Sequence, residues 1–262
     1  AVANVAGLVA AGAAISVARV TGDVEALVGN AAEIGAEAAM VGAVVVDAQR
    51  RTDIGPRGGI FGHLATGIAG ALFAGTGGLA EVTIGDPARP EAGRVRAEIG
   101  DGAQLRARDR VAVTAADTLT GKVEVNAFAF GLVAVGGTVA RAIASAPVTA
   151  RVGRNAQISA RAVESAAGDV TVSATSLVNL GVSATPLSGG LASGNAAETS
   201  LTLRPATAAL VEGAARIDAK RGITVASSSG PVGTSDVLSR SYAGLVAGSD
   251  VKAAATVVTS AM

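Results

Sequence analysis

The sequence predicts an all-β protein, a β-solenoid in which each strand hydrogen-bonds to its equivalent in the next rung of a coil. Three observations predict this fold: short segments alternate between apolar and polar residues, two sequence phrases recur along the chain, and the apolar residues are mostly small. Of the 262 residues, 35 are glycine and only 2% are aromatic. Because a globular core normally buries several aromatic side chains, we expect a thin, repetitive core of Ala, Val and Leu.

A seven-residue phrase occurs four times. The four copies are VGNAAEI, IGDGAQL, VGRNAQI and VEGAARI, and their first residues are Val28, Ile99, Val152 and Val211. Each copy has an apolar residue, usually a glycine, two variable residues, an alanine, one variable residue and then Ile or Leu; we call it the VGxxAxI phrase. Successive copies start 71, 53 and 59 residues apart. Such recurrence is expected if the chain coils and each copy of the phrase forms the same corner of the coil.

Each residue of the third copy has an expected place at that corner. Gly153 and Asn155 tolerate a turning backbone, and Ala156 fits where space is tight. The remaining positions alternate, with Val152 and Ile158 expected inside and Gln157 and Ser159 expected in water. The phrase is therefore predicted to be architectural rather than catalytic.

A second, glycine-rich phrase occurs five times, once before each copy of the first and once after the last copy. Its occurrences are AGLVAAGAAISVA at 6–18, AGALFAGTGGLAEV at 69–82, FGLVAVGGTVARA at 130–142, SGGLASGNAAETSL at 188–201 and AGLVAGSDVKAAA at 243–255. Together the two phrases and the segments between them form superrepeats of about 55–70 residues, a periodicity typical of solenoids and other repeat architectures.

The connecting segments follow the period of two that is typical of half-buried strands. In VRAEI, for example, Val95, Ala97 and Ile99 share one face, and Arg96 and Glu98 share the other. The same alternation occurs at 148–152, 158–162, 170–174, 217–220 and 223–227. These segments are expected to be strands.

Several segments leave alternatives open. Residues 31–45 are rich in alanine and could locally form a helix, whereas the polar, proline-containing stretches 47–59 and 85–93 are expected to be loops. A sandwich of hairpins would need tight Asp-Gly turns, and IGDGA at 99–103 is a fair candidate. With rungs of roughly 20 residues, each superrepeat would form about three rungs. The chain would then have about 13 rungs and extend about 60 Å.

We expect residues 1–262 to form a single segment. Because the chain begins and ends within a repeat, we interpret it as a fragment of a longer protein.

The combination of VTARVGRNAQISARA (148–162) and GDVTVSA (168–174) with Ala/Gly-rich interludes resembles the repeat regions of filamentous-haemagglutinin-like and autotransporter adhesins. The resemblance covers nearly the whole chain. It implies a right-handed parallel β-helix that is exported to the bacterial outer cell surface by two-partner or autotransporter secretion. Such repeat regions carry no catalytic motif, so the resemblance assigns no functional residue.

The residues provide little for catalysis or phosphate binding. The single histidine, His63, has no G-x-S-x-G nucleophile to serve. GTGGLA at 75–80 fits a loose dinucleotide fingerprint, but a strand-like run follows it in place of the required helix. TGKV at 120–123 lacks the upstream glycine of a phosphate-binding loop, since position 116 is alanine. We therefore assign no catalytic and no cofactor-binding residues and expect no enzyme.

Metal binding is also not expected. The chain has no cysteine, which excludes disulfides and thiolate ligands. Asp23, Asp101 and Asp169 lie in turn-like contexts but are too widely and irregularly spaced for a calcium-binding nonapeptide series. A single turn aspartate is expected to bond its own backbone instead.

Charge limits the partners. The 21 basic and 21 acidic residues balance, and no basic run offers a nucleic-acid footprint. Residues 1–18 and 62–80 lack Lys, Arg, Asp and Glu and approach the length of a membrane span, but Ala and Gly dominate them and their flanks alternate with period two. We expect no membrane insertion of this segment. The expected partners are a host or neighbouring-cell surface, extracellular matrix or further copies of the chain.

The sequence thus favours a structural or adhesive shaft of a secreted or surface-exposed bacterial protein, without catalysis. Two alternatives remain. One is a solenoid enzyme acting on polysaccharides, for which residues 86–110 form the densest charged cluster, although one Tyr and no Trp provide poorly for stacking on sugar rings. The other is a subunit of a self-assembling extracellular filament, because open edge strands can pair with another copy.

Overall fold

The computed structural model describes residues 1–54, 65–86, 88–89, 92–161, 167–258 and 260–261. The described residues form strands and turns with no helix, so the prediction of an all-β protein is confirmed. The local helix considered for residues 31–45 is wrong, because this segment holds β3 (Glu33–Ile34), a turn and the start of β4 (Val41–Ile54). Residues 47–54 belong to β4 and are not a loop, whereas 85–93 joins two strands, as expected.

Sixteen strands account for most of the described residues. They are β1 (Val2–Val20), β2 (Val24–Val28), β3 (Glu33–Ile34), β4 (Val41–Ile54), β5 (Ala65–Ile84), β6 (Val95–Ile99), β7 (Gln104–Phe130), β8 (Val133–Ala144), β9 (Pro147–Val152), β10 (Gln157–Ala160), β11 (Asp169–Leu203), β12 (Ala206–Val211), β13 (Arg216–Ala219), β14 (Gly222–Val237), β15 (Arg240–Val257) and β16 (Ser260–Ala261). They form an 11-stranded sheet and a five-stranded sheet of order β16-β12-β9-β6-β2. The ladders between these strands are parallel, whereas hairpins would give antiparallel ladders.

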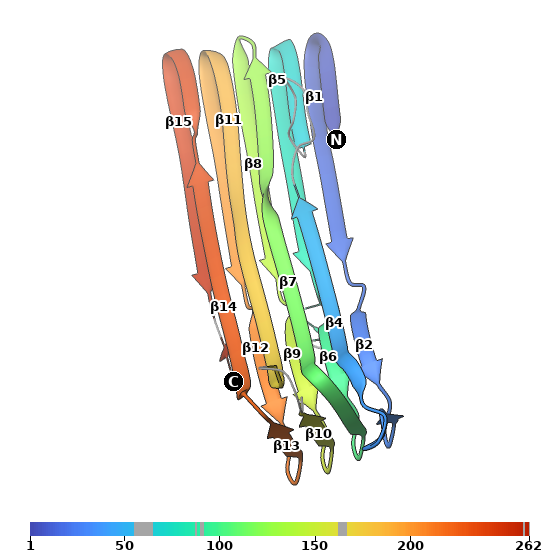
Figure 1. Cartoon of the computed structure of the whole chain (residues 1–262). Coiled ribbons are helices and arrows are strands. Elements are labelled where there is room, and N and C mark those ends of the chain that lie inside the picture. Colours follow the sequence, from blue (N-terminus) through green and yellow to red (C-terminus); the bar gives the residue numbers. More distant parts are fainter. Residues whose placement is uncertain (55–64, 87, 90–91, 162–166, 259, 262) are drawn as a thin grey trace.

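The chain runs back and forth between two ends of an elongated molecule (Figure 1). At one end, which we call the base, each VGxxAxI phrase leads from the five-stranded sheet into the 11-stranded sheet. At the opposite end, β1, β5, β11 and β15 fold back on themselves within the strand (Figure 1). In the remaining superrepeat, β7 ends and β8 begins there, on either side of Gly131 and Leu132.

Paired residues lie one superrepeat apart. Val28 pairs with Ile99, Ile99 with Val152, and Val152 with Val211, so the spacing of the VGxxAxI phrases is the register of the ladder. The expectation of three short rungs per superrepeat is wrong. We call a stack of paired strands from successive superrepeats a wall, and one superrepeat contributes one long strand to each wall. The wall β1-β5-β8-β11-β15 is five strands deep, which is about 20 Å at ~4.8 Å per strand rather than about 60 Å.

Four long strands form a closed ring of parallel pairings. β5 pairs with β7 through residues 65–70 and with β8 through residues 73–84. β11 likewise pairs with β7 before the fold-back and with β8 after it. The ring arises because β5 and β11 continue through the fold-back, whereas β7 and β8 are separate strands on its two sides.

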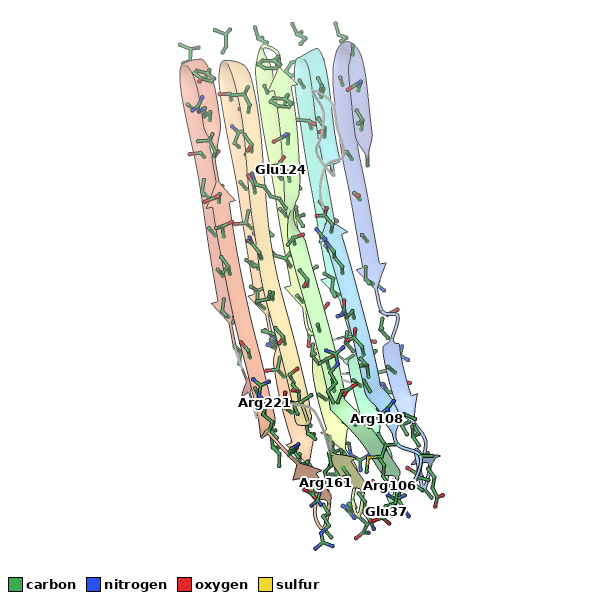
Figure 2. The ribbon with its side chains drawn as sticks, in the orientation of Figure 1. Glu37, Arg106, Arg108, Glu124, Arg161 and Arg221 are labelled. Carbon is green, nitrogen blue, oxygen red and sulfur yellow. The ribbon has the colours of Figure 1, made fainter. Side chains whose placement is uncertain are left out.

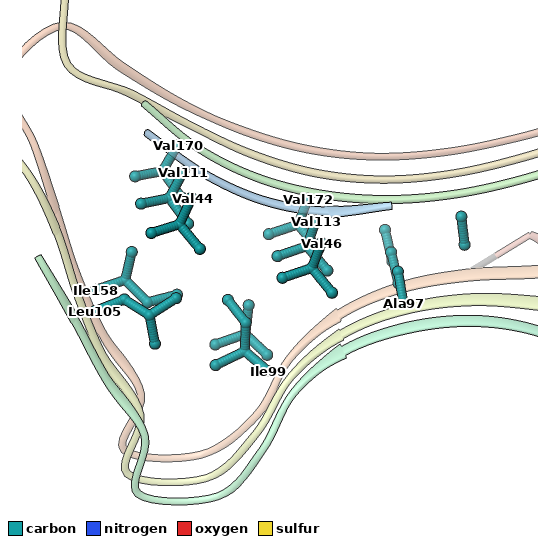
Figure 3. Packing of buried hydrophobic residues seen from close by; sticks show 14 of the residues in the cluster. Val44, Val46, Ala97, Ile99, Leu105, Val111, Val113, Ile158, Val170 and Val172 are labelled. Carbon is teal, nitrogen blue, oxygen red and sulfur yellow. The ribbon is translucent and has the colours of Figure 1, made fainter. Parts of the chain in front are cut away.

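The core near the base confirms the predicted alternation. Val44, Val111 and Val170 come from three successive superrepeats and stack on one another (Figure 3), as the register requires. Ile99 on β6 and Ile158 on β10 face them from two further walls (Figure 3), and all five side chains are buried. Each superrepeat therefore adds one layer of Val, Ile, Leu and Ala to the core cluster near the base.

The VGxxAxI corner has the predicted interior. Val152, Ala156 and Ile158 are fully or almost fully buried, and Gln157 is exposed. Ser159 is only partly exposed. The fourth residue of every copy adopts a left-handed backbone: Ala31 (φ 53°), Gly102 (69°), Asn155 (56°) and Ala214 (58°). The recurring phrase is thus a corner with one fixed backbone conformation.

The glycine of the phrase is required by close stacking of neighbouring corners. A Cβ on Gly153 would lie 2.7 Å from the Asp101 backbone nitrogen and 2.8 Å from the Gly100 carbonyl carbon. Gly29 belongs to the first copy, and a Cβ there would meet nothing within 4 Å. Glycine therefore avoids a backbone clash with the preceding corner at Gly153, whereas the fourth copy has Glu212 at the equivalent position.

Candidate functional site

A group of charged side chains lies near the base, with Arg151 of β9 at its centre. Its Nε and Nη2 donate to the two carboxylate oxygens of Glu212 at 2.7 and 2.6 Å, and Nη2 also donates to Asp101 Oδ1 at 2.9 Å. Its Nη1 donates to Glu98. Glu98 and Asp101 belong to the preceding superrepeat and Glu212 to the following one, so Arg151 joins three layers.

The electrostatics of this group favour ion pairing. Hydrogen bonds from Arg151 lower the pKa of the Glu212 carboxyl below its ordinary value, and the same bonds raise the pKa of the Arg151 guanidinium. A general acid in a glycosidase needs a raised pKa. Glu212 is thus suited to pair with the Arg151 guanidinium and not to act as a proton donor.

The charged cluster considered from the sequence, residues 86–110, contributes further ion pairs. Arg94 lies 2.6 Å from a Glu25 carboxylate oxygen, and Arg96 contacts Glu98. Glu25 lies on β2 and Arg94 directly precedes β6, whereas Arg96 and Glu98 both lie on β6. The Arg94–Glu25 pair therefore connects adjacent superrepeats, and the Arg96–Glu98 pair lies within one strand.

The three aspartates considered for calcium bond elsewhere. Asp23 Oδ1 accepts hydrogen bonds from the backbone N–H groups of Gly93 (2.8 Å) and Arg94 (3.0 Å), which lie one superrepeat later. Asp101 Oδ1 likewise accepts from the Arg154 backbone, and Asp169 lies 3.7 Å from Arg221. Asp23 and Asp101 thus bond the neighbouring superrepeat instead of their own turn.

The described residues contain no group of three or more His, Cys, Asp or Glu side chains placed to hold a metal ion.

The other sequence candidates have no catalytic setting. His63 lies outside the described residues. GTGGLA at 75–80 lies within β5, and TGKV at 120–123 lies within β7. Both motifs are therefore strand segments, whereas a phosphate-binding loop leads from a strand into a helix.

The end opposite the base has a different chemistry. We call it the apolar tip and define it as residues 6–12, 70–76, 130–136, 189–195 and 242–249, which occupy equivalent positions in five superrepeats and contain no Asp, Glu, Lys or Arg. Each segment has one leucine at the fold-back: Leu8, Leu72, Leu132, Leu191 and Leu245. The middle three are flanked by neighbours on both sides and are still 46%, 44% and 46% exposed.

A shallow groove of about 480 Å³ crosses the strands beside the apolar tip. Its lining includes Gly77, Gly137 and Ala196, which are paired in register, the large apolar Leu79 and Val139, and the charged Glu198, Asp250 and Lys252. The groove is thus lined by small, apolar and charged side chains.

The pattern of the glycine-rich phrase indicates a repeating architecture and does not by itself predict the exposed leucine row. The available signal was the recurrence of one leucine per superrepeat inside a charge-free segment, at a position where the inward/outward alternation changes phase.

No helix in the described part of the chain is long and apolar enough to cross a membrane.

Comparison of the chain with known protein families, curated proteins and solved structures finds no match.

Proposed function

We propose that the chain is a segment of a right-handed parallel β-helix that serves as a structural or adhesive shaft, without catalysis, in a large secreted or surface-exposed bacterial protein. One observation carries the proposal. Successive superrepeats pair in parallel along both walls, with an offset that equals the superrepeat length. Strands stacked in this way transmit structure from one layer to the next along a single axis.

A shaft needs length and cohesion rather than a reactive centre. In repeat architectures each unit contacts mainly its neighbours, so stability accumulates with the number of units. Here each layer is held to the next by backbone ladders, by stacked Val, Ile and Ala side chains, and by ion pairs such as those of Arg151. The outward side chains remain available for a cell surface, matrix or further copies of the chain.

Deleting one superrepeat in register tests the fold. Removing residues 125–183 joins Glu124 to Ala184, and Ala184 is the register partner of Val125. We expect the shortened protein to remain folded by circular dichroism and to shorten by about 4.8 Å along the stacking axis in small-angle scattering. The matched control removes residues 125–153, about half a superrepeat, and should not fold. Loss of structure in the in-register deletion would contradict a solenoid.

The shaft role is tested on the complete secreted protein. Electron microscopy should show a rod whose length follows the number of superrepeats, and beads coated with this segment should bind host cells or matrix proteins if the shaft is adhesive. Release of products from acidic polysaccharides would overturn the non-enzymatic role.

The open edges support a second candidate, a filament subunit. Among the described strands, β1 pairs with β5 alone and β15 with β11 alone. An exposed edge strand can template pairing with another chain. Filaments that appear with rising protein concentration would support this role, and strictly monodisperse short particles would count against it.

A further inference from the structure

The apolar tip reverses the usual distribution of side chains in a strand. Every Val, Leu, Phe and Tyr in its five segments is exposed. The exposed residues besides the leucines are Val9, Phe73, Phe130, Val133, Val135, Tyr242 and Val246. The buried residues there are small or polar: Ala10, Ala74, Thr76, Ala134, Gly136, Ser193 and Asn195. Near the base the opposite holds, since large aliphatic residues fill the interior.

Large apolar side chains that point outward over an interior of small or polar residues are typical of strands that face lipid. In the apolar tip the inward residues include the alanine cluster of Ala10, Ala74 and Ala134. In water, the outward Leu and Phe side chains of the tip remain between 44% and 80% exposed, so only part of their apolar surface gains from the folded state. Against acyl chains the same side chains are removed from water, which is favourable in proportion to their apolar area. The reversal is confined to the end of the molecule where the leucines stand in a row.

The charge-free zone is deep enough for interfacial insertion. Arg240 and Asp250 are the charged residues nearest to Leu245, five residues away on either side, or about 16 Å of extended strand. Around Leu132 the nearest charges, Glu124 and Arg141, are eight and nine residues away. Interfacial elements bury their apolar face about 5–10 Å into the boundary between headgroups and acyl chains. The apolar tip can reach that depth without burying a charge.

Figure 2 shows the separation of charge from the apolar tip. The labelled Glu37, Arg106 and Arg161 lie at the base, and the side chains at the opposite end are mainly carbon. The apolar tip offers no basic residue to attract anionic headgroups. The lipid surface that suits it is therefore zwitterionic or uncharged.

The area of the leucine row argues against a second protein copy as the occupant. Five strands at ~4.8 Å and two walls about 10 Å apart give the end face that carries the leucine row a projected area of roughly 200 Å². A stable protein interface needs about 800 Å² per partner. A ridge that is narrow, straight and apolar can instead enter a fluid bilayer, which adapts to its shape.

The geometry points to the apolar tip as a lipid-docking edge that inserts into the outer layer of a zwitterionic bilayer, with the strands standing out of the membrane. This docking is confined to the membrane interface, and no helix in the described residues is long and apolar enough to span the bilayer. It is independent of the shaft role, since an enzyme or filament with this edge would dock in the same way.

The protein carries a natural probe for this docking. Tyr242 is the only tyrosine, there is no tryptophan, and Tyr242 lies exposed in the apolar tip. Mixing the full chain with phosphatidylcholine vesicles that contain acyl-brominated lipid should quench tyrosine emission. Adding phosphatidylserine should not strengthen binding, and about 0.5 M NaCl should not abolish it, because screening acts on charges.

Two triple variants separate the tip from exposed apolar residues in general. The tip variant carries Leu72→Ser, Leu132→Ser and Leu191→Ser. The control carries Leu27→Ser, Val45→Ser and Leu177→Ser, which are similarly exposed but lie outside the apolar tip. Both should keep the parent circular dichroism and melting temperature. The tip variant should lose at least tenfold in vesicle binding by co-sedimentation, and the control should bind as the parent does.

Three results would overturn the inference. Equal vesicle binding by the two triple variants would show that the tip is not the contact. Binding that requires phosphatidylserine or disappears in salt would indicate electrostatic adsorption. A dimer in light scattering that only the tip variant dissociates, together with no vesicle binding, would assign the surface to a second copy.

Discussion

Arg50 and Asp117 form a buried ion pair inside the wall shared by β4 and β7. They are register partners, and Arg50 Nε and Nη2 donate to Asp117 Oδ1 and Oδ2 at 2.9 and 2.7 Å. The two side chains are only 7% and 3% exposed. Arg50 Nη1 also donates to the Gly93 carbonyl oxygen at 2.6 Å, so the pair connects β4 and β7 with the segment before β6. Asp117 lies in β7 between Ala115, which belongs to the core cluster near the base, and Leu119, which belongs to a second core cluster.

Removing one partner of this pair should destabilise the protein strongly. Asp117→Asn leaves the Arg50 guanidinium buried without a counter-charge, which costs about 3–5 kcal/mol in comparable settings. Urea denaturation followed by circular dichroism measures this loss. Glu198→Gln removes one partner of the exposed Arg141–Glu198 pair, and this control should change the unfolding free energy by less than about 1 kcal/mol.

A double replacement distinguishes the effect of an unpaired buried charge from the effect of the space that the two side chains fill. Arg50→Met with Asp117→Leu fills the same space without charge and should recover most of the loss, because apolar replacement of buried ion pairs is often neutral. If Asp117→Asn cost no more than Glu198→Gln, the buried pair would have no special role in stability.

The sequence predicted the corner better than the interior. The VGxxAxI phrase predicted the placement of Val152, Ala156 and Ile158, since alternation and small-residue positions are local signals. Arg50 stood in a stretch expected to be a loop, because a charged residue at an inward position breaks the pattern that identifies a strand. Its partner Asp117 is 67 residues away, and no local pattern links the two.

The length of each rung and the chemistry of the tip also could not be predicted, because local sequence patterns do not specify them. The phrase spacing of 71, 53 and 59 residues equals the sequence offset between paired strands. The spacing alone does not determine how many corners lie between two copies. The sequence assigned no inward or outward orientation to the leucine of the glycine-rich phrase. At the fold-back of β5, however, Leu72 and Phe73 are both exposed, because the strand changes its phase there.

Glycine should be needed at position 153, where the backbone of the preceding corner lies close, although the fourth copy of the phrase has Glu212 at the equivalent position. In Gly153→Ala the new Cβ would lie 2.7 Å from a backbone nitrogen of the preceding corner, closer than non-bonded contacts allow. We expect a loss of about 1–3 kcal/mol, as for other overpacked sites. Gly29→Ala is the matched control, because its Cβ meets open space, and it should stay within about 0.5 kcal/mol of the parent. Thermal melts of both variants check this, and equal losses would refute the stacking explanation.

Two adjacent residues of the same phrase should respond oppositely to enlargement. Ala156 is fully buried, so Ala156→Leu should overpack the corner and destabilise the protein by about 1–3 kcal/mol. Gln157 is exposed, and Gln157→Lys should be nearly neutral. Equal shifts in thermal melts would contradict the inward and outward assignment.

The Glu212 carboxyl should make stability depend on pH in the acid range. Its pKa in the folded protein is lowered, mainly by hydrogen bonds from Arg151, from an ordinary value of 4.5. The unfolded chain therefore binds the proton more readily, so the contribution of Glu212 is present above pH 4.5 and is lost as the pH falls through the folded-state pKa. We expect the melting temperature to fall less steeply with acidification in Glu212→Gln than in the parent. Arg151→Met should flatten the same part of the profile, and adding either change to the other should have little further effect, because both remove one interaction. A parent and a Glu212→Gln variant with parallel profiles below pH 4.5 would show that the Arg151–Glu212 contact does not stabilise the folded state.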